Sequence, residues 1–335
     1  MSVFSPLEVP SIPANEKLKE IKLTEEQEAK YAEVLAHFDK EDYKLPSEEK
    51  GELMDEEKMW LSKECILRYL RASKWNVATA KHRIDDTLKW RREYGFHNET
   101  LSPENVEAEA VTGKEVLFGF DVQGRPAFYM IPSRQNTEES PRQLQYAVWM
   151  MERCIDLMGP GVETLDLLIN FADKGKNPSF STARTMLHYI QAHYPERLGL
   201  ALIINVPMLV NAFFKLIMPF VDPVTRHKVK FNPRIIEDGF FTRDQIMKQW
   251  WGGDCDFEYV HEKYWPALVH MCDERRAKQI KRWKELGAKV GISEWDMKTG
   301  WDTTSNSQSG VVSISEKNVE MPAVSVEPPA AVVNA

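Results

Sequence analysis

The sequence predicts an α/β protein in which an N-terminal helical module is followed by a domain built on a mostly parallel sheet. Three observations indicate this. Residues 62–95 read as two helices with apolar residues at helical spacing. From residue 114 to residue 231 short apolar strands alternate with helices, as in parallel sheets with helical crossovers. The uncharged run over residues 198–214 contains a proline and two asparagines, so it fits a buried strand and a helix better than a membrane span.

The N-terminal part carries recognisable helix start signals. Thr24, Ser62 and Asn76 each stand where a side-chain oxygen can cap a helix, and the residues after Thr24 complete a capping box. The last of these helices is expected to end at Gly95. An acidic connector over residues 39–55 joins the first helix to the other two.

The second part reads as alternating strands and helices. Strands are expected over residues 114–121, 126–131, 165–171, 200–205 and 228–231, with helices beginning at Ser140 and near residue 181. A further helix over residues 207–221 is apolar on nearly every side. One face can rest on the protein, and the other must meet a buried element, an apolar ligand or a bilayer.

These elements give a domain organisation of five segments. They are a flexible leader (1–20), a helical module (21–98), the α/β domain (108–255), a C-terminal helical extension (256–300) and a disordered tail (301–335).

The charge distribution argues against nucleic acid as a partner. Residues 1–60 hold sixteen acidic and eight basic residues, which accounts for the whole net charge of −8 and leaves the remainder neutral. Basic residues do gather on predicted helices of the N-terminal module and of the C-terminal extension: Arg68, Arg71, Lys74, Lys81, Arg83, Lys89, Arg91, Arg92, and Arg275, Arg276, Lys278, Lys281, Arg282, Lys284. Solvated helix faces are the expected explanation, and contact with an anionic membrane is the alternative.

Enzyme signatures are missing from the sequence. It contains no phosphate-binding loop, no nucleophile elbow and no metalloprotease helix, and its four cysteines lack metal-type spacing and read as reduced thiols. Cys65 and Arg71 do have the spacing of a thiol phosphatase. The residues between them belong to a helix whose backbone amides are already bonded, so Cys65 is expected to be inert packing. No metal site is expected.

Polar residues on either side of the uncharged run suggest a ligand site. Glu196 precedes it, whereas Thr225 and Lys228 follow it at a spacing that places them on one face of a helical turn. A carboxylate, a hydroxyl and an ammonium that converge would suit a polyol phosphate. The alternative is that these residues cap secondary structure.

Several motifs resemble the CRAL-TRIO family, the lipid-binding fold of the fungal phosphatidylinositol transfer proteins. They occur in order over about residues 60–255: Leu67-Arg-Tyr-Leu-Arg-Ala72, Lys89-Trp-Arg-Arg92, Asp121-x-x-Gly-Arg-Pro126, Tyr194-Pro-Glu-Arg-Leu-Gly199, Asn205-Val-Pro207, Pro219-Phe-x-Asp-Pro-Val-Thr225 and Gly252-Gly253. The resemblance implies a helical N-terminal module, a sheet that floors a large lipid cavity, and a gate helix over residues 207–221.

The resemblance also implies a binding site for the phosphatidylinositol headgroup. It carries the family's headgroup residues onto Glu196, Thr225 and Lys228, and Asp222 and Arg197 lie in the same motifs. The gate-helix residues that it implies are Met208, Leu209, Phe213, Phe214, Leu216, Ile217 and Phe220.

Departures from the family pattern bear on the second ligand. Ser73 stands where the phosphatidylinositol and phosphatidylcholine exchangers carry an arginine, and Leu165, Leu167 and Ile190 replace small hydroxyl residues that hold phosphatidylcholine. An apolar lining cannot satisfy a buried phosphocholine group. The pattern is similar to the drug-resistance branch, which pairs phosphatidylinositol with a sterol, although the three apolar residues could equally be core packing.

The expected function is therefore lipid transport without catalysis. The protein is expected to exchange phosphatidylinositol between membranes, with a sterol as second ligand, and so to influence phosphoinositide and sterol homeostasis. Its expected partners are membrane surfaces and a phosphatidylinositol kinase, with no cofactor beyond bound lipid, and its expected state is a monomer, with a dimer as the alternative. It is expected in the cytoplasm, peripheral at the endoplasmic reticulum, lipid droplets or cell periphery.

Two other functions stay open from the sequence. The first is a lipid sensor that presents phosphatidylinositol to a kinase or scaffold without bulk transfer. The second is a lipid phosphatase that uses Cys65.

Overall fold

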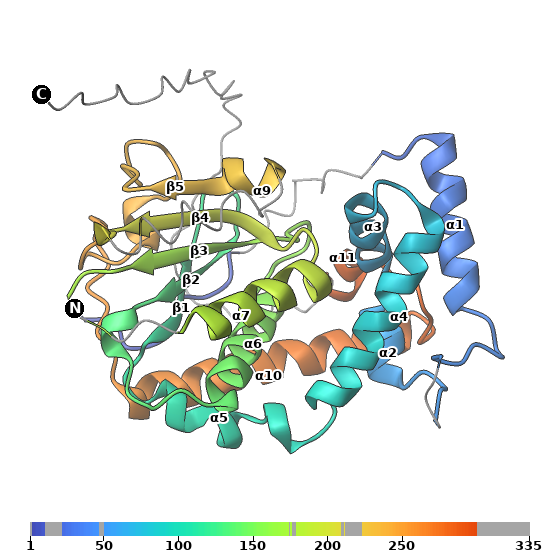
Figure 1. Ribbon diagram of the computed structural model, residues 1–335, viewed down its shortest axis with the longest axis horizontal. Helices are drawn as coiled ribbons and strands as arrows, with labels where there is room; N and C mark the ends of the chain where they lie inside the picture. The colour runs from blue at the N-terminus through green and yellow to red at the C-terminus, as the bar shows by residue number, and fades with distance from the viewer. Residues whose placement is uncertain are drawn as a thin grey trace, which may run out of the picture. The chain divides into compact units, whose positions relative to one another are not determined.

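A five-stranded sheet lies at the centre of the computed structural model, which describes residues 2–10, 22–46, 50–173, 175, 179–208, 211 and 223–299, without the side chains of 180 and 223–225. The strands are β1 (Glu115–Phe120), β2 (Pro126–Met130), β3 (Leu165–Asn170), β4 (Leu198–Ile204) and β5 (Val229–Phe231), and they lie in that order across the sheet. Only β1 and β2 pair in antiparallel fashion, and the other neighbours are parallel (Figure 1). The predicted fold class is confirmed.

The N-terminal helices begin and end at the predicted signals. They are α1 (Glu25–Phe38), α2 (Asp55–Trp60), α3 (Lys63–Ala72) and α4 (Val77–Tyr94). Thr24 accepts a hydrogen bond from the Gln27 N–H, and the Gln27 side chain accepts one from the Thr24 N–H, which confirms the capping box. Ser62 and Asn76 cap α3 and α4, and Gly95 ends α4 with a φ of 93°.

The remaining helices surround the sheet. They are α5 (Pro103–Ala110), α6 (Pro141–Asp156), α7 (Phe180–His193), α9 (Pro223–Lys228), α10 (His261–Glu285) and α11 (Glu294–Met297), with short 3-10 turns at Glu99–Leu101, Pro132–Arg134 and Arg243–Gln245. Helix α6 packs on β1 and β2 and against α10, whereas α7 contacts α4 (Figure 1). Neither α2, α5 nor α11 was predicted, because a helix of four to eight residues shows too little apolar periodicity.

Part of the expected flexible leader is attached to the core. The Val3 N–H donates to the carbonyl of Asp256, and the Glu258 N–H donates to the carbonyl of Val3. Pro6 is buried, and Leu7 packs against the main core. Residues 2–10 therefore differ from the prediction because short backbone pairing and apolar contacts attach them to the segment before α10.

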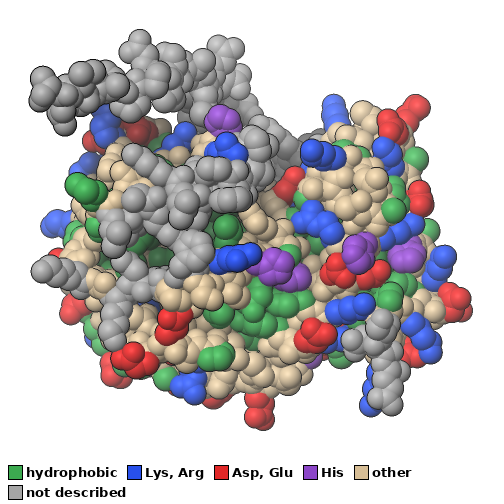
Figure 2. Space-filling model, in the orientation of Figure 1, with side chains coloured by type: hydrophobic (Ala, Val, Ile, Leu, Met, Phe, Trp, Pro, Cys, Tyr) green, Lys and Arg blue, Asp and Glu red, His purple; other side chains and the backbone are tan. Residues whose placement is uncertain are grey.

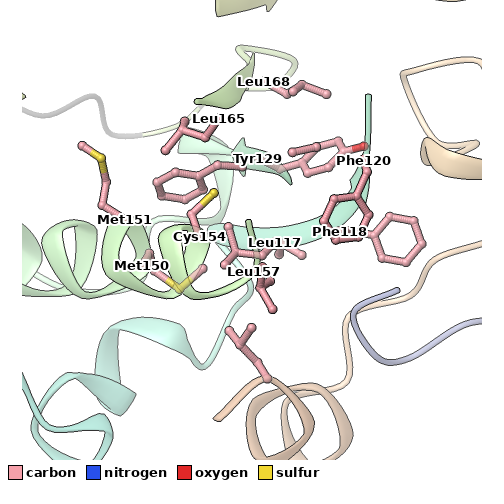
Figure 3. Close-up of a cluster of buried hydrophobic side chains, with 14 of the residues drawn as sticks. Leu117, Phe118, Phe120, Tyr129, Met150, Met151, Cys154, Leu157, Leu165 and Leu168 are labelled. Carbon is pink, nitrogen blue, oxygen red and sulfur yellow. The ribbon is translucent and has the colours of Figure 1, made fainter. Parts of the chain in front are cut away.

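Two apolar cores underlie these elements. The larger joins the sheet to α6 and α10, and the smaller lies among α1, α3 and α4 and includes Val290. Figure 3 shows Leu165 directed toward Met151 and Cys154 of α6, with Leu168 on the opposite side of its strand. The two sides of β3 thus differ: Leu165 and Leu167 share one, and Asp166 and Leu168 share the other.

A carboxylate is buried in the middle of this apolar sheet. Asp166 of β3 has no exposed surface, and its Oδ1 accepts from the Leu200 N–H at 2.8 Å. Arg125, from the loop between β1 and β2, lies 3.8 Å from Asp166 and 3.7 Å from Asp121. Burial, and then the charge of Asp121, raises the pKa of Asp166 to about 8. The Asp121–Asp166 pair therefore takes up a proton more readily than two separate exposed carboxylates would, and the guanidinium of Arg125 offsets part of its negative charge.

Gly199 leaves space for this buried group, and we expect Gly199→Ala to destabilise the protein. A Cβ at position 199 would lie 2.5 Å from Asp166 Oδ1 and 2.8 Å from Arg125 Cδ. Relief requires a shift of an enclosed carboxylate, so the free energy of unfolding should fall by about 1–3 kcal/mol. Urea unfolding measures this. Gly159→Ala, whose Cβ would meet nothing closer than Val9 at 4.0 Å, is the control and should stay near wild type.

Candidate functional site

Glu196 lies in the short connection between α7 and β4. Its backbone has a φ of 57°, in the left-handed region, so the chain turns sharply just before the strand begins. The side chain is 36% exposed, and its Oε2 accepts from Nε of Arg71 at 2.5 Å. The structure therefore presents a partly solvated carboxylate whose one oxygen is fixed by an arginine from the N-terminal module.

Lys228 lies beside the same end of the sheet. It is the last residue of α9 and directly precedes β5, which pairs in parallel with β4. Its Nζ donates to the carbonyl of Leu198, the first residue of β4, at 2.6 Å. Glu196 and Lys228 thus lie at the amino ends of neighbouring strands. Thr225 is on α9 with its side chain outside the described atoms, and Asp222 lies outside the described residues.

Arg197 has a different environment from its neighbour Glu196. Its side chain is buried, and Nη1 donates to the carbonyl of Glu163 at 2.9 Å. Nη2 lies 3.8 Å from a carboxylate oxygen of Glu294. Among the described residues, the Arg197 guanidinium therefore pairs with buried groups. It does not share the partly exposed environment of Glu196.

The end of α7 is clamped to α4 just before Glu196. The ring of His193 stacks on Trp90 with centroids 4.1 Å apart, and its Nδ1 lies 3.1 Å from the Thr87 hydroxyl. The hydroxyl of Tyr69 donates to the His193 carbonyl, and that of Tyr194 donates to Glu152. These contacts fix the point from which the connection to β4 departs.

The three residues expected at the second ligand do not share one environment. Leu165 is 4% exposed and packs on α6 (Figure 3), which agrees with the alternative that this residue is part of the core. Leu167 and Ile190 are only partly buried against the same core. Leu167 follows Leu165 on the same side of β3, so this side changes from enclosed to partly open along the strand.

The predicted gate helix lies almost wholly outside the described residues. Met208 begins a helix and is 89% exposed, and residue 211 is also helical. Leu209, Phe213, Phe214, Leu216, Ile217 and Phe220 lie outside the described residues. The chamber that this helix would close therefore stays a prediction. Within the described part of the chain, no helix is both long and apolar enough to cross a membrane.

Two predicted solvated arginines are buried instead. Arg68 is 2% exposed and Arg91 is 6% exposed, and each is paired with carboxylates from other elements. Helix α3 contributes residues to the smaller core, and its Arg68 also pairs with Glu163 just before β3, so the basic residues of this helix do not all face solvent. Elsewhere, Figure 2 shows basic and acidic side chains interspersed over the visible described surface rather than one basic patch.

Cys65 lacks the surroundings of a nucleophile. It is 1% exposed within α3, and burial raises the pKa of its thiol to about 11. Ser73, where the family pattern has an arginine, is 8% exposed, and its hydroxyl has no hydrogen-bond partner within the described residues. Those residues also hold no cluster of three or more histidine, cysteine, aspartate or glutamate side chains suited to a metal.

Comparison with known proteins gives the family. Residues 110–253 match the CRAL/TRIO domain, and residues 30–86 match the CRAL/TRIO N-terminal domain. The chain is 40% identical over 298 residues to the phosphatidylinositol transfer protein PDR17 of Saccharomyces cerevisiae, which covers 82% of this chain and 84% of that protein. The chain therefore belongs to the CRAL/TRIO family.

Other relatives extend the same likeness. A CRAL-TRIO domain-containing protein of Schizosaccharomyces pombe is 49% identical over 284 residues, which is 83% of this chain but 28% of that protein. The SEC14 cytosolic factor of Candida glabrata is 30% identical over 49% of this chain and 61% of that protein. The crystal structure of Sfh5 matches with a TM-score of 0.52 at 15% identity, over 77% of this chain and 99% of that one, which shows likeness of fold.

The main site residue that sequence reasoning missed is Arg71. The sequence pattern predicts Arg71 to lie on a solvated helix face, although the residue belongs to the Leu67–Ala72 motif. Its partners Glu163 and Glu196 are distant in sequence, so local spacing gave no sign of the pairing. The Leu67–Ala72 motif was the one sequence feature that marked Arg71, and a motif does not identify the residue's contacts.

His193 makes stability depend on pH near the site. Burial, and then the charges of His188, Arg83 and Arg91, lowers its pKa to about 4. As the pH falls, His193 is protonated in the unfolded chain at a higher pH than in the folded protein. The free energy of unfolding therefore falls as the pH falls from 6.5 towards 4. We expect His193→Gln to reduce that loss by about 1–2 kcal/mol, a figure discounted because the ring is partly exposed.

Urea unfolding at pH 7 and pH 4.5 measures the difference. His82→Gln is the control, because the His82 side chain is 76% exposed and should leave the pH dependence unchanged. An equal pH dependence in wild type and His193→Gln would contradict the assignment.

Proposed function

We propose that this protein binds phosphatidylinositol and exchanges it between membranes, with a sterol as its second ligand. The observation that carries the proposal is the pair Glu196 and Lys228 at the amino ends of β4 and β5. The pair occurs in a chain that is 40% identical to a phosphatidylinositol transfer protein over most of its length. We place this exchange at cytoplasmic membrane surfaces, where it would influence phosphoinositide and sterol homeostasis.

The chemistry of the pair suits an inositol phosphate. A carboxylate accepts hydrogen bonds from ring hydroxyls, and an ammonium on a flexible stem meets phosphate charge. Glu196 is partly exposed, which leaves its carboxylate accessible to a ligand and supports the first role. Lys228 would carry the second, with Thr225 and Asp222 as further headgroup contacts.

Transfer needs an apolar carrier for the rest of the lipid. A diacyl lipid has on the order of thirty methylenes at about 0.8 kcal/mol each, so passage through water costs roughly 20 kcal/mol. A helix over residues 207–221 that is apolar on nearly every side would close a cavity over the sheet. On opening, its outer face would enter the membrane interface.

The second ligand is proposed from the apolar side of β3. Leu167 and Ile190 are partly buried, and they carry no hydroxyl that could satisfy a phosphocholine group. A sterol, with a fused apolar body and one hydroxyl, makes little demand for buried hydrogen bonds. Leu165 packs on α6 and would support the lining formed by Leu167 and Ile190.

A double substitution tests the headgroup assignment. Glu196→Ala with Lys228→Ala should abolish phosphatidylinositol transfer between vesicles, because both headgroup contacts are lost, and should leave sterol uptake intact. Glu274→Ala with Lys278→Ala, two exposed residues of α10, is the matched control. Thermal unfolding checks the fold, since Lys228 also bonds the Leu198 carbonyl. Normal phosphatidylinositol transfer by the double variant would show that the assignment is wrong.

The same vesicles separate exchange from lipid presentation. An exchange protein moves labelled phosphatidylinositol between vesicles in the absence of any kinase. A presenting protein instead stimulates a phosphatidylinositol kinase at fixed lipid with little transfer, and that result would replace the proposed function.

Leu167→Thr tests the second ligand. A hydroxyl on the partly open side of β3 should raise uptake of phosphatidylcholine several-fold relative to sterol, because one hydrogen-bond partner contributes about 1 kcal/mol. Leu200→Thr introduces the same hydroxyl on the opposite side of the sheet, beside Asp166, and serves as the control. Equal lipid ratios in the two variants would argue that Leu167 is core packing.

A further inference from the structure

A chain of alternating charges runs inward from Glu196. Arg71 bonds Glu196 through Nε at 2.5 Å and lies 3.3 Å from Glu163 through Nη2. The same Glu163 oxygen accepts from Nη1 of Arg68 at 2.8 Å, and Nη2 of Arg68 donates to Glu294 at 2.5 Å. We call Glu196, Arg71, Glu163, Arg68 and Glu294 the ion chain. It joins three carboxylates through two guanidinium groups.

The ion chain becomes more enclosed from Glu196 to Arg68, and its last member, Glu294, has a side chain that is 12% exposed. Side-chain exposure is 36% at Glu196, 29% at Arg71, 16% at Glu163 and 3% at Arg68. Ion pairs are weak where solvent screens them and strong where it does not. The inner end can therefore hold a fixed geometry, whereas the outer end has solvent on one side.

The inner end is anchored in α11. The hydroxyl of Ser62 donates to Glu294 at 2.8 Å, and the Glu294 N–H donates to Glu64 at 2.6 Å. Burial acts to raise the pKa of Glu294, but the charges of Arg68, Arg197 and Lys298 outweigh it and lower that pKa well below the usual range. Glu294 is therefore a charged, fixed group at neutral pH.

The outer end is arranged to present one oxygen. Arg71 occupies Oε2 of Glu196, and no described residue bonds Oε1. Glu196 stands in a turn with a left-handed backbone, and Arg71 is the partner that the described residues give its side chain. Arg71 is itself held on two sides, by Glu163 and by Glu196.

We propose that Glu294 is a positioning residue for the headgroup site, acting through Arg68, Glu163 and Arg71 on the carboxylate of Glu196. The inference rests on the proposed function and deepens it by making helix α11 part of the site. Selection of an inositol ring requires an acceptor at a fixed place, because its hydroxyls have a fixed arrangement. Glu294 lies outside both segments that match the CRAL/TRIO domains.

The test compares two lipids that share their acyl chains. Phosphatidylinositol and phosphatidic acid both carry the phosphate, and only the first carries the ring. In full-length Glu294→Gln the preference for phosphatidylinositol should fall about tenfold, as for one hydrogen bond to a charged group, while phosphatidic acid binding stays unchanged. Glu163→Gln, in the middle of the ion chain, should do the same.

A matched control and a double-substitution cycle separate positioning from general destabilisation. Glu285→Gln removes an exposed carboxylate that, among the described residues, bonds Arg282 on the preceding turn of α10, and it should keep the wild-type preference. In a Glu196→Gln background, Glu294→Gln should cause no further loss, because its effect passes through Glu196. Additive losses, or equal losses for both lipids, would overturn the inference.

Folding and the proposed function are checked in the same experiment. If thermal unfolding shows that Glu294→Gln does not fold, the more exposed Glu163→Gln decides the question alone. A wild-type preference that persists in the folded variants would overturn the inference while the proposed function stands. A wild-type protein that does not prefer phosphatidylinositol would overturn both.

Discussion

The pairing of one buried guanidinium constrains how the chain is assembled. Arg68 belongs to the N-terminal module, Glu163 precedes β3, and Glu294 belongs to α11. A buried charge that loses its partner costs about 3–5 kcal/mol. The three segments must therefore meet whenever Arg68 is enclosed. This agrees with the grouping of residues Met1–Asp302 into one compact unit, although they contain two separate apolar cores.

A buried carboxyl group explains much of the Asp121–Pro126 motif. Asp166 interrupts an otherwise apolar strand, and Arg125 reaches it from the preceding hairpin loop. Asp121 orients that loop by accepting a hydrogen bond from the Arg125 N–H, and Gly199 leaves room for the side chains of Asp166 and Arg125. Within the structure, these motif residues contact one another and β3. The family resemblance is therefore stronger evidence for the fold than for the lipid that is bound.

Features set by local chemistry could be predicted, whereas those set by distant contacts could not. Thr24, Ser62 and Asn76 act within one helical turn of themselves, so their sequence context sufficed. The bond from Arg68 to Glu294 spans 226 positions and that from Arg71 to Glu196 spans 125. Periodicity treats each helix alone, and it consequently assigned the basic residues of α3 to solvent.

The same limit applies to the candidate site. Glu196 and Lys228 were proposed from residue chemistry and family motifs, and the parallel pairing of β4 with β5 places them at one edge of the sheet. Their supporting residues come from α3 and α11, which no motif connects to them. Lys228 also has a structural contact, because it satisfies the carbonyl at the start of β4. Loss of total transfer would therefore mix folding with recognition, whereas selectivity between two lipids with the same acyl chains isolates recognition, since both ligands depend equally on the fold.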